Sequence, residues 1–202
     1  MNAHLYIEGG ESKEDKIRCR EGFRKLLEKA GLSGRMPRLS ACGGRGSVFD
    51  DFKTAHSGRQ AGDYIAMLID SEDPIADIEK TWDHLKNRDN WDRPAGAVDD
   101  QVLFMTTCME TWIVTDRATL QEHYGPMLQE NALPALVKME DRNRHDVYDK
   151  LAHASRNCSN AYSKGKRSFE ILAKLDPAIL KQYLPSFVRV DRILQEKLFT
   201  QT

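Results

Sequence analysis

The chain has 202 residues, with 30 Lys and Arg against 31 Asp and Glu. This length predicts a single domain with its own hydrophobic core, because domains usually span about 100–200 residues. Neither strong nucleic-acid affinity nor membrane attachment can be inferred from the balanced total charge, so any basic surface must be local.

The cysteines, Cys19, Cys42, Cys108 and Cys158, are far apart in the chain and form no CxxC pair. This spacing disfavours a zinc site and a disulfide framework, so we interpret them as small buried thiols of a reducing cytosol. The N-terminal residues lack the basic and long apolar segments of a signal peptide. No apolar run approaches the roughly 20 residues of a membrane span. We therefore expect a cytoplasmic protein with no membrane attachment.

The first part of the chain alternates predicted strands and helices. Residues 3–7 predict a short buried strand, and residues 12–30 have the apolar period of a helix. A second strand is predicted over 37–41 and a second helix over 47–57. Residues 64–70, an apolar run that ends in an acid, predict a strand covered on both faces. This alternation predicts an α/β fold with a central, mostly parallel sheet flanked by helices.

Both predicted helices begin with a serine that can accept a hydrogen bond from a free backbone N–H group. Ser12 is followed three residues later by Asp15, which resembles the acidic partner of a capping box. Ser47 opens the second helix in the same way.

Residues 71–100 are predicted to be irregular apart from one short helix, and the C-terminal part of the chain is predicted to be mostly helical. The elements after residue 70 are, in order, a short helix near 75–85, a strand over 101–107, helices over 109–125 and a mostly helical tail over 166–199. Asp176-Pro177 and Pro185 predict breaks in the tail, because proline cannot continue a helix.

Acidic residues follow two of the predicted strands. Glu8 ends the first strand, and Asp70, Glu72 and Asp73 follow the apolar run 64–69. Ligands of open α/β sheets collect at the carboxyl ends of the strands, so we expect Glu8, Asp70 and Glu72 to cluster there. Such carboxylates suit Mg²⁺, and the chemistry would be metal-assisted phosphoryl transfer. The alternative is that these are loop acids, with Asp70 capping the next segment.

Other residues compete for a role. Glu110 begins a predicted helix just past the fourth strand, where a negative charge also favours the helix dipole. Asp99 and Asp100 precede that strand and would lie at the wrong edge of a parallel sheet. Trp112 is interpreted as core rather than as a base-stacking platform.

Basic residues beside glycines are candidate phosphate contacts. Lys164, Lys166 and Arg167 lie in "SKGKRSFE", and Arg45 lies in "ACGGRG". A flexible basic loop can hold a nucleic-acid backbone, and a lysine near a metal can neutralise charge on a phosphate. The alternative for both segments is a solvated turn or helix start.

Several enzyme classes are disfavoured by missing motifs. The sequence has no GxSxG elbow, no GxxxxGK phosphate loop and no HExxH zinc motif. A serine hydrolase and a P-loop ATPase are therefore not expected, and any ATP hydrolysis would come from a partner.

The strand-end acids resemble those of the Toprim domain, the catalytic domain of topoisomerases, primases and several nucleases. Its hallmarks are a glutamate ending the first strand and a D-x-D pair ending a later one, here "YIEGG" and "LIDSED". The sequence departs from that pattern in two places. The pair reads Asp70-Ser71-Glu72 unless Asp73 takes the second place, and Ser12 stands where many nuclease-type domains have another acid.

A larger set of motifs resembles the bacterial domain-of-unknown-function family 4276, over roughly residues 5 to 190. The motifs are "YIEGG", "ACGGR", "DSEDP", "WDRP", "DDQ", "CMETW" and "KGKRSFEILAKLDP". The resemblance implies a Toprim-type protein, of a kind often paired with an ATPase in mobile or phage-defence gene pairs. It also implies a Toprim-like core over 1–125 and a mostly helical C-terminal extension over 126–202, packed as one compact unit.

The implied function is a Mg²⁺- or Mn²⁺-dependent nuclease acting on DNA or RNA. On this hypothesis Glu8, Asp70 and Glu72 bind the metal and take part in catalysis, with Asp73 as a further ligand and Glu110 as a further catalytic residue. The candidate phosphate contacts are Arg45, Lys164, Lys166 and Arg167. The partners would be the nucleic acid and a separate ATPase, and the chain could form oligomers. The alternative is a non-catalytic interaction module bound to that ATPase.

Overall fold

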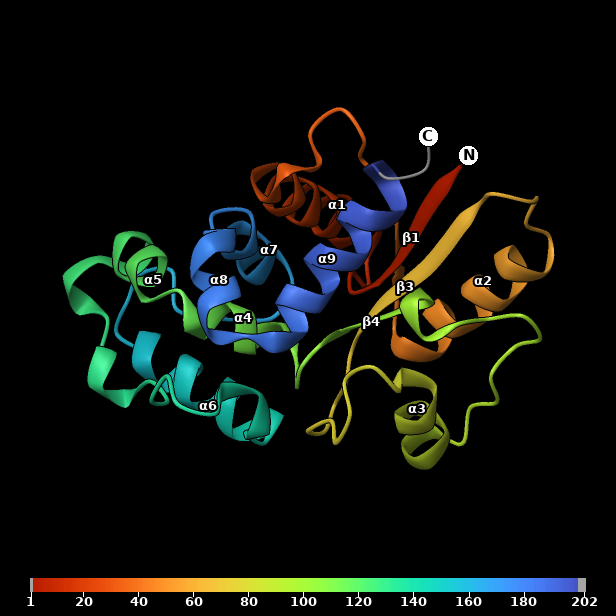
Figure 1. The fold of residues 1–202 in the computed structure, drawn as a ribbon. Coiled ribbons are helices and arrows are strands. Elements are labelled where there is room, and N and C mark those ends of the chain that lie inside the picture. The colour runs from red at the N-terminus through yellow and green to blue at the C-terminus, as the bar shows by residue number, and fades with distance from the viewer. Residues whose placement is uncertain (1, 200–202) are drawn as a thin grey trace.

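The computed structural model describes residues 2–199, which fold around a four-stranded sheet with the strand order β2-β1-β3-β4 (Figure 1). The strands are β1 (Ala3–Glu8), β2 (Arg38–Gly43), β3 (Tyr64–Asp70) and β4 (Val102–Met105). Every neighbouring pair is parallel. The predicted α/β class with a parallel central sheet is therefore confirmed.

Helices connect the strands and follow the last of them. They are α1 (Lys13–Leu27), α2 (Arg45–Ser57), α3 (Thr81–Asp89), α4 (Met109–Thr115), α5 (Arg117–Tyr124), α6 (Arg144–Ser155), α7 (Lys166–Leu172), α8 (Pro177–Tyr183) and α9 (Pro185–Phe199). A π-helical turn, Glu28–Leu32, extends α1. Among residues 2–199 no helix combines the length and apolar character needed to cross a membrane.

The sheet is covered on both faces, which explains its continuous apolar strands. Leu5 and Leu68 pack into a core shared with α1 and the C-terminal helices. Met67 and Ile69, which point the other way, pack against α2 and α3. Figure 1 shows α1 and α9 on one side of the sheet and α2 and α3 on the other. Burial on both faces favours apolar residues at consecutive positions, as expected for parallel strands.

The C-terminal helices pack directly on the α/β layers. α9 lies along β4, and α7 packs against α1. Trp112 is fully buried, as expected, and makes edge-on aromatic contacts with Phe23 of α1 and Phe187 of α9. Helices α4 to α8 gather at one end of the sheet, to the left in Figure 1.

The predicted helix starts were partly right. Ser12 caps α1, where its Oγ accepts a hydrogen bond from the Asp15 N–H at 3.0 Å. The Asp15 carboxylate contacts Arg18 instead of completing a capping box. The Ser47 cap was wrong, because α2 begins two residues earlier, after Gly44, and has no side-chain cap.

The third helix starts later than predicted because its cap comes from a distant residue. The carboxylate of Asp99 accepts hydrogen bonds from the Trp82 N–H at 3.0 Å and from the Thr81 hydroxyl at 3.1 Å. Near the C-terminus, Asp176-Pro177 and Pro185 separate α7, α8 and α9 as predicted. The cysteines are all buried and free, also as predicted.

Gly10 is required by the turn between β1 and α1. Its φ is +76°, and a Cβ there would lie 2.7 Å from the backbone N and Cα of Lys16. The double glycine therefore has a packing role at the start of α1.

We expect Gly10→Ala to lower the free energy of unfolding by at least about 2 kcal/mol, because strain and a backbone clash add. Gly46→Ala is the matched control, since a Cβ there meets nothing within 4 Å and alanine favours a helix. Urea denaturation measures both. Equal stability of Gly10→Ala and the wild type would contradict this account of the turn.

Candidate metal centre

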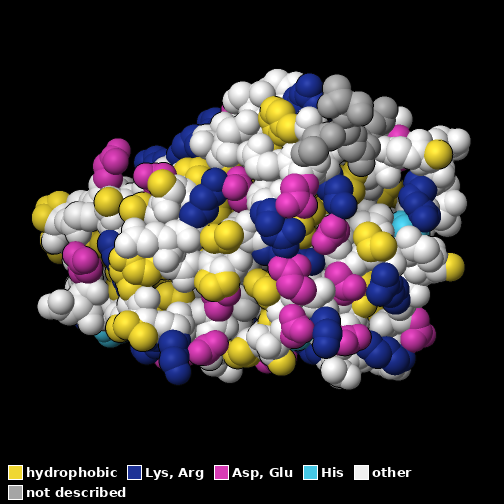
Figure 2. Space-filling model, viewed as in Figure 1, with side chains coloured by type: hydrophobic (Ala, Val, Ile, Leu, Met, Phe, Trp, Pro, Cys, Tyr) yellow, Lys and Arg dark blue, Asp and Glu magenta, His cyan; other side chains and the backbone are white. Residues whose placement is uncertain are grey.

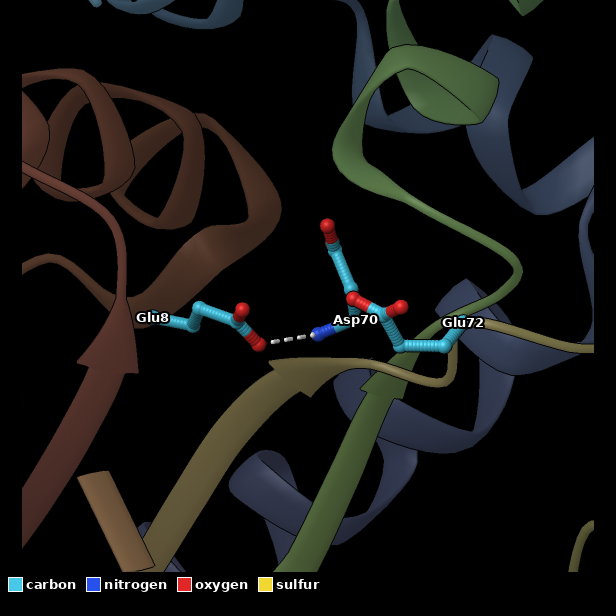
Figure 3. A group of neighbouring side chains, drawn as sticks. All are labelled: Glu8, Asp70 and Glu72. Atoms are coloured by element: carbon cyan, nitrogen blue, oxygen red, sulfur yellow. Dashed lines mark hydrogen bonds between the residues drawn. The ribbon is translucent and has the colours of Figure 1, made fainter. Parts of the chain in front are cut away.

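The strand-end acids meet at the carboxyl edge of the sheet. β1 and β3 are neighbours, and the chain leaves β1 for β2 on one side and β3 for β4 on the other. Such a switch point is where open α/β sheets bind ligands. Glu8, Asp70 and Glu72 each offer one carboxylate oxygen, and these atoms lie within 4.8 Å of one another. Figure 3 shows Glu8 and Glu72 approaching Asp70 from opposite sides.

Glu8 is held in place by a backbone donor and by Arg45. Its Oε2 accepts a hydrogen bond from the Asp70 N–H at 3.0 Å and lies 3.8 Å from Arg45 Nη1. Burial raises the pKa of Glu8, although Arg45 and the Asp70 N–H oppose that change. A glutamate with a raised pKa is a better proton acceptor than an exposed one.

Asp70 is perturbed more strongly than Glu8. Its Oδ1 accepts a hydrogen bond from the Met109 N–H at 2.8 Å, at the start of α4. Burial first, then the charges of Glu8 and Glu110, raise the pKa of Asp70 well above its ordinary value. A bound cation would favour the ionised carboxylate and reverse this effect. Asp70 also acts as a cap, but for α4 and not for the segment that follows it.

Glu72 is fixed by an unusual backbone conformation and by two arginines. Its φ is 71°, rare for a residue with a side chain. Its N–H donates to the Thr107 carbonyl at 2.8 Å. Its Oε2 contacts Arg88 Nη2 at 2.9 Å and also Arg144 Nη1. Strained residues of this kind concentrate at functional sites.

Asp73 lies outside the cluster. Its carboxylate contacts Arg88 Nε at 3.0 Å, and its side chain is 63% exposed against 11% for Glu72. Glu72, and not Asp73, therefore joins Glu8 and Asp70 in the cluster.

A cleft of about 310 Å³ opens beside the cluster. Glu8, Asp70, Glu110 and Lys164 line it, together with Asp15 from the first turn of α1. Lys164 Nζ lies 4.0 Å from Glu110 Oε1 and 5.4 Å from the centre of the Tyr148 ring. The cleft thus combines several carboxylates with one lysine ammonium group.

Glu110 is buried and has a specific partner. The Tyr162 hydroxyl donates to its Oε1 at 2.8 Å. Burial, followed by the charge of Glu110, raises the pKa of Tyr162 well above its ordinary value, so the phenol stays protonated and donates. Glu110 lies at the cleft wall rather than in the group of Glu8, Asp70 and Glu72.

The other predicted phosphate contacts have partners within the protein. Arg45 binds both oxygens of Asp89, through Nε at 3.2 Å and Nη2 at 2.7 Å, and donates to the Asp70 carbonyl. Lys166 pairs with Glu170 along α7, and Arg167 donates to a backbone carbonyl. Of the predicted set, Lys164 lines the cleft.

The parallel direction of β4 decides the place of Asp99 and Asp100. Both lie at the amino end of that strand, where Asp99 caps α3 and Asp100 contacts Lys197 at 3.0 Å. They are absent from the candidate metal centre, as expected for a parallel strand.

Sequence reasoning missed three residues near the centre. Asp15 was interpreted only as a capping partner, although it follows Glu8 by seven residues across a tight turn and lines the cleft. Arg88 and Arg144 lie on α3 and α6, and their local sequence contains no signal that links them to Glu72.

The acidic cluster fits a hard divalent cation. Mg²⁺ takes oxygen ligands at about 2.1 Å, so ligands on opposite sides are about 4.2 Å apart. The carboxylate oxygens of the cluster, within 4.8 Å of one another, need only a small side-chain movement to reach that spacing. Glu8, Asp70 and Glu72 would hold the ion.

The fold and the site define a parallel α/β protein with a candidate metal centre at the sheet switch point. Residues 12–192 match the family described as "Domain of unknown function (DUF4276)", so the chain belongs to that family. Asp70, Glu72 and Arg144 lie within the matched range, and Glu8 lies just before it. No curated protein and no solved structure matches the chain significantly.

We expect Asp70→Asn to stabilise the metal-free protein at neutral pH. A carboxyl whose pKa is raised on folding contributes stability below its unfolded pKa of about 4, and that contribution is lost as the pH rises through the folded value. The neutral asparagine amide avoids this loss of stability. Each kcal/mol of unfolding free energy that is regained raises the Tm by about 2–4 °C.

Thermal melts in chelator from pH 4 to pH 8 measure this effect. The advantage of Asp70→Asn should shrink toward pH 4. Asp50→Asn, at an exposed acid of α2, should change the Tm little. A variant less stable than the wild type at pH 7 would contradict the expected sign.

We expect saturable Mg²⁺ or Mn²⁺ binding by calorimetry, weakened at least about ten-fold by Glu8→Gln because a direct ligand is lost. Glu122→Gln, at an exposed acid of α5, is the matched control. Circular dichroism checks that each variant is folded. Equal affinity of Glu8→Gln and the wild type would remove Glu8 from the ligand set.

Proposed function

We propose that this protein is a Mg²⁺- or Mn²⁺-dependent nuclease that hydrolyses phosphodiester bonds in DNA or RNA. The observation that carries the proposal is the meeting of Glu8, Asp70 and Glu72 at the ends of neighbouring parallel strands, beside a cleft that also contains Lys164. The resemblance of these acids to the Toprim pattern supports the same chemistry.

Each side chain has a distinct task in this proposal. Glu8, Asp70 and Glu72 hold the cation, which supplies charge stabilisation at a phosphoryl oxygen. Glu8 is also the candidate base that accepts the proton of the attacking water or hydroxyl. The Lys164 ammonium group, at the cleft wall near Glu110, stabilises negative charge on the phosphate.

The proposal includes a separate ATPase partner in a phage-defence or mobile-element system. Its support is the resemblance described above, together with the mixed surface charge of the chain. On the face in Figure 2, Lys and Arg side chains are intermixed with Asp and Glu. A nuclease with a balanced total charge, here 30 Lys and Arg against 31 Asp and Glu, would take part of its nucleic-acid binding surface from a partner.

A second candidate is a non-catalytic interaction module. It is favoured by the arginines at the cluster, because Arg45 lies near Glu8 while Arg88 and Arg144 both contact Glu72. Acids neutralised in this way can serve as a structural ion-pair network without a metal. The proposed partner is again the ATPase.

Cleavage assays on single- and double-stranded DNA and on RNA, with Mg²⁺ or Mn²⁺ and with the ATPase from the same gene pair, separate the two candidates. We expect metal-dependent cleavage that falls at least about 100-fold in Asp70→Asn and in Lys164→Met. Glu122→Gln should keep full activity. Cleavage unaffected by Asp70→Asn, or wild-type protein that binds the ATPase but cuts none of the substrates, would favour the interaction module.

A further inference from the structure

The two arginines that contact Glu72, Arg88 and Arg144, differ in their other acidic partners. Arg88 contacts Glu72 and also the carboxylates of Asp73 and Asp89. Arg144, in contrast, forms its ion pair with Glu72. Arg88 would therefore keep acidic partners if Glu72 turned to another ligand, whereas Arg144 would be left with an exposed positive charge.

Arg144 is placed where it can reach a ligand in the solvent. It is the first residue of α6, a 12-residue helix whose positive dipole end lies at the same place. Its side chain is 34% exposed, against 11% for Glu72. Arg144 thus brings a partly exposed guanidinium group from the C-terminal helical region to the edge of the acidic cluster.

A divalent cation and Arg144 compete for the same carboxylate. A divalent cation that lies among Glu8, Asp70 and Glu72 repels the guanidinium group of Arg144, which already contacts Glu72. The cation therefore binds less tightly than it would bind to the three acids without Arg144. A phosphate group beside the cation changes this balance. Arginine binds phosphate with two parallel hydrogen bonds, which gives Arg144 a new partner of the right charge and shape.

We propose that Arg144 is a phosphate-binding residue that rests on Glu72, so that a divalent cation and a nucleic-acid phosphate bind this centre cooperatively. The inference rests on the proposed function, since it names how that site takes its substrate. Because binding is reciprocal, the phosphate raises cation affinity by the same factor by which the cation raises phosphate affinity.

Calorimetric titration of Mg²⁺, with and without thymidine 3′,5′-bisphosphate, tests this coupling. The bisphosphate represents two neighbouring backbone phosphates, and a blank titration corrects for its own Mg²⁺ binding. In the wild type we expect it to tighten Mg²⁺ binding at least about five-fold, the lower end of typical coupling between sites. Titrating the bisphosphate at saturating and at zero Mg²⁺ should give the same factor.

Arg144→Gln removes the guanidinium group that competes with the cation for Glu72, and with it the proposed phosphate contact. We expect it to bind Mg²⁺ more tightly than the wild type when no bisphosphate is present, and to show a smaller enhancement by bisphosphate. Arg144→Lys, which keeps the charge without the planar fork, should fall between them. Arg156→Gln removes the same charge about 18 Å along the axis of α6 and should match the wild type.

The possible results are distinct. Weaker Mg²⁺ binding by folded Arg144→Gln without bisphosphate would overturn the proposal and make Arg144 a residue that positions Glu72. Undiminished enhancement by bisphosphate in Arg144→Gln would also overturn it. Wild-type protein that binds no Mg²⁺ with or without bisphosphate would overturn the metal centre itself, and the coupling with it.

Discussion

Mutual repulsion between carboxylates at the carboxyl edge of the sheet is the constraint around which this region is built. Glu8 and Asp70 end adjacent strands, and Glu72 turns back toward them through a backbone of positive φ. Each acid has its own compensating donor. The Asp70 N–H serves Glu8, the Met109 N–H serves Asp70, and Arg88 with Arg144 serves Glu72. Distant segments are thereby drawn to one edge of the sheet.

This arrangement is not the one that stability alone would favour. A buried carboxyl with a strongly raised pKa costs stability at neutral pH, and a residue such as Glu72 in the left-handed region adds backbone strain. Proteins keep such features where function needs them, and stabilise the surrounding fold by other contacts. Here those contacts are the two cores on either side of the sheet.

The C-terminal helical region takes part in the site as well as in the core. Arg144 reaches Glu72 from the start of α6, while Tyr162 and Lys164, between α6 and α7, lie against Glu110. α9 lies along β4 and so supports the edge of the sheet next to Asp70. Chemistry at the strand ends would therefore depend on residues from both parts of the chain.

Several features could be predicted because they depend on local physics. The apolar run 64–69 identified a strand buried on both faces, and Pro177 and Pro185 marked the starts of α8 and α9. The position of Glu8 and Asp70 at strand ends, combined with parallel topology, was enough to place them together. Ser47 failed as a cap because α2 begins at Arg45, two residues earlier, and Ser47 lies inside its first turn.

The sequence by itself determined the α/β class, the parallel sheet and the acids that gather at its edge, because hydrophobic period, proline and strand direction act over short distances. Tertiary structure alone decided that Asp73 turns away, that Arg45 binds Asp89, and that Arg144 rests on Glu72. These are contacts between side chains far apart in the chain. Charge pairing of that kind depends on how the helices pack on the sheet, and no spacing along the sequence encodes it.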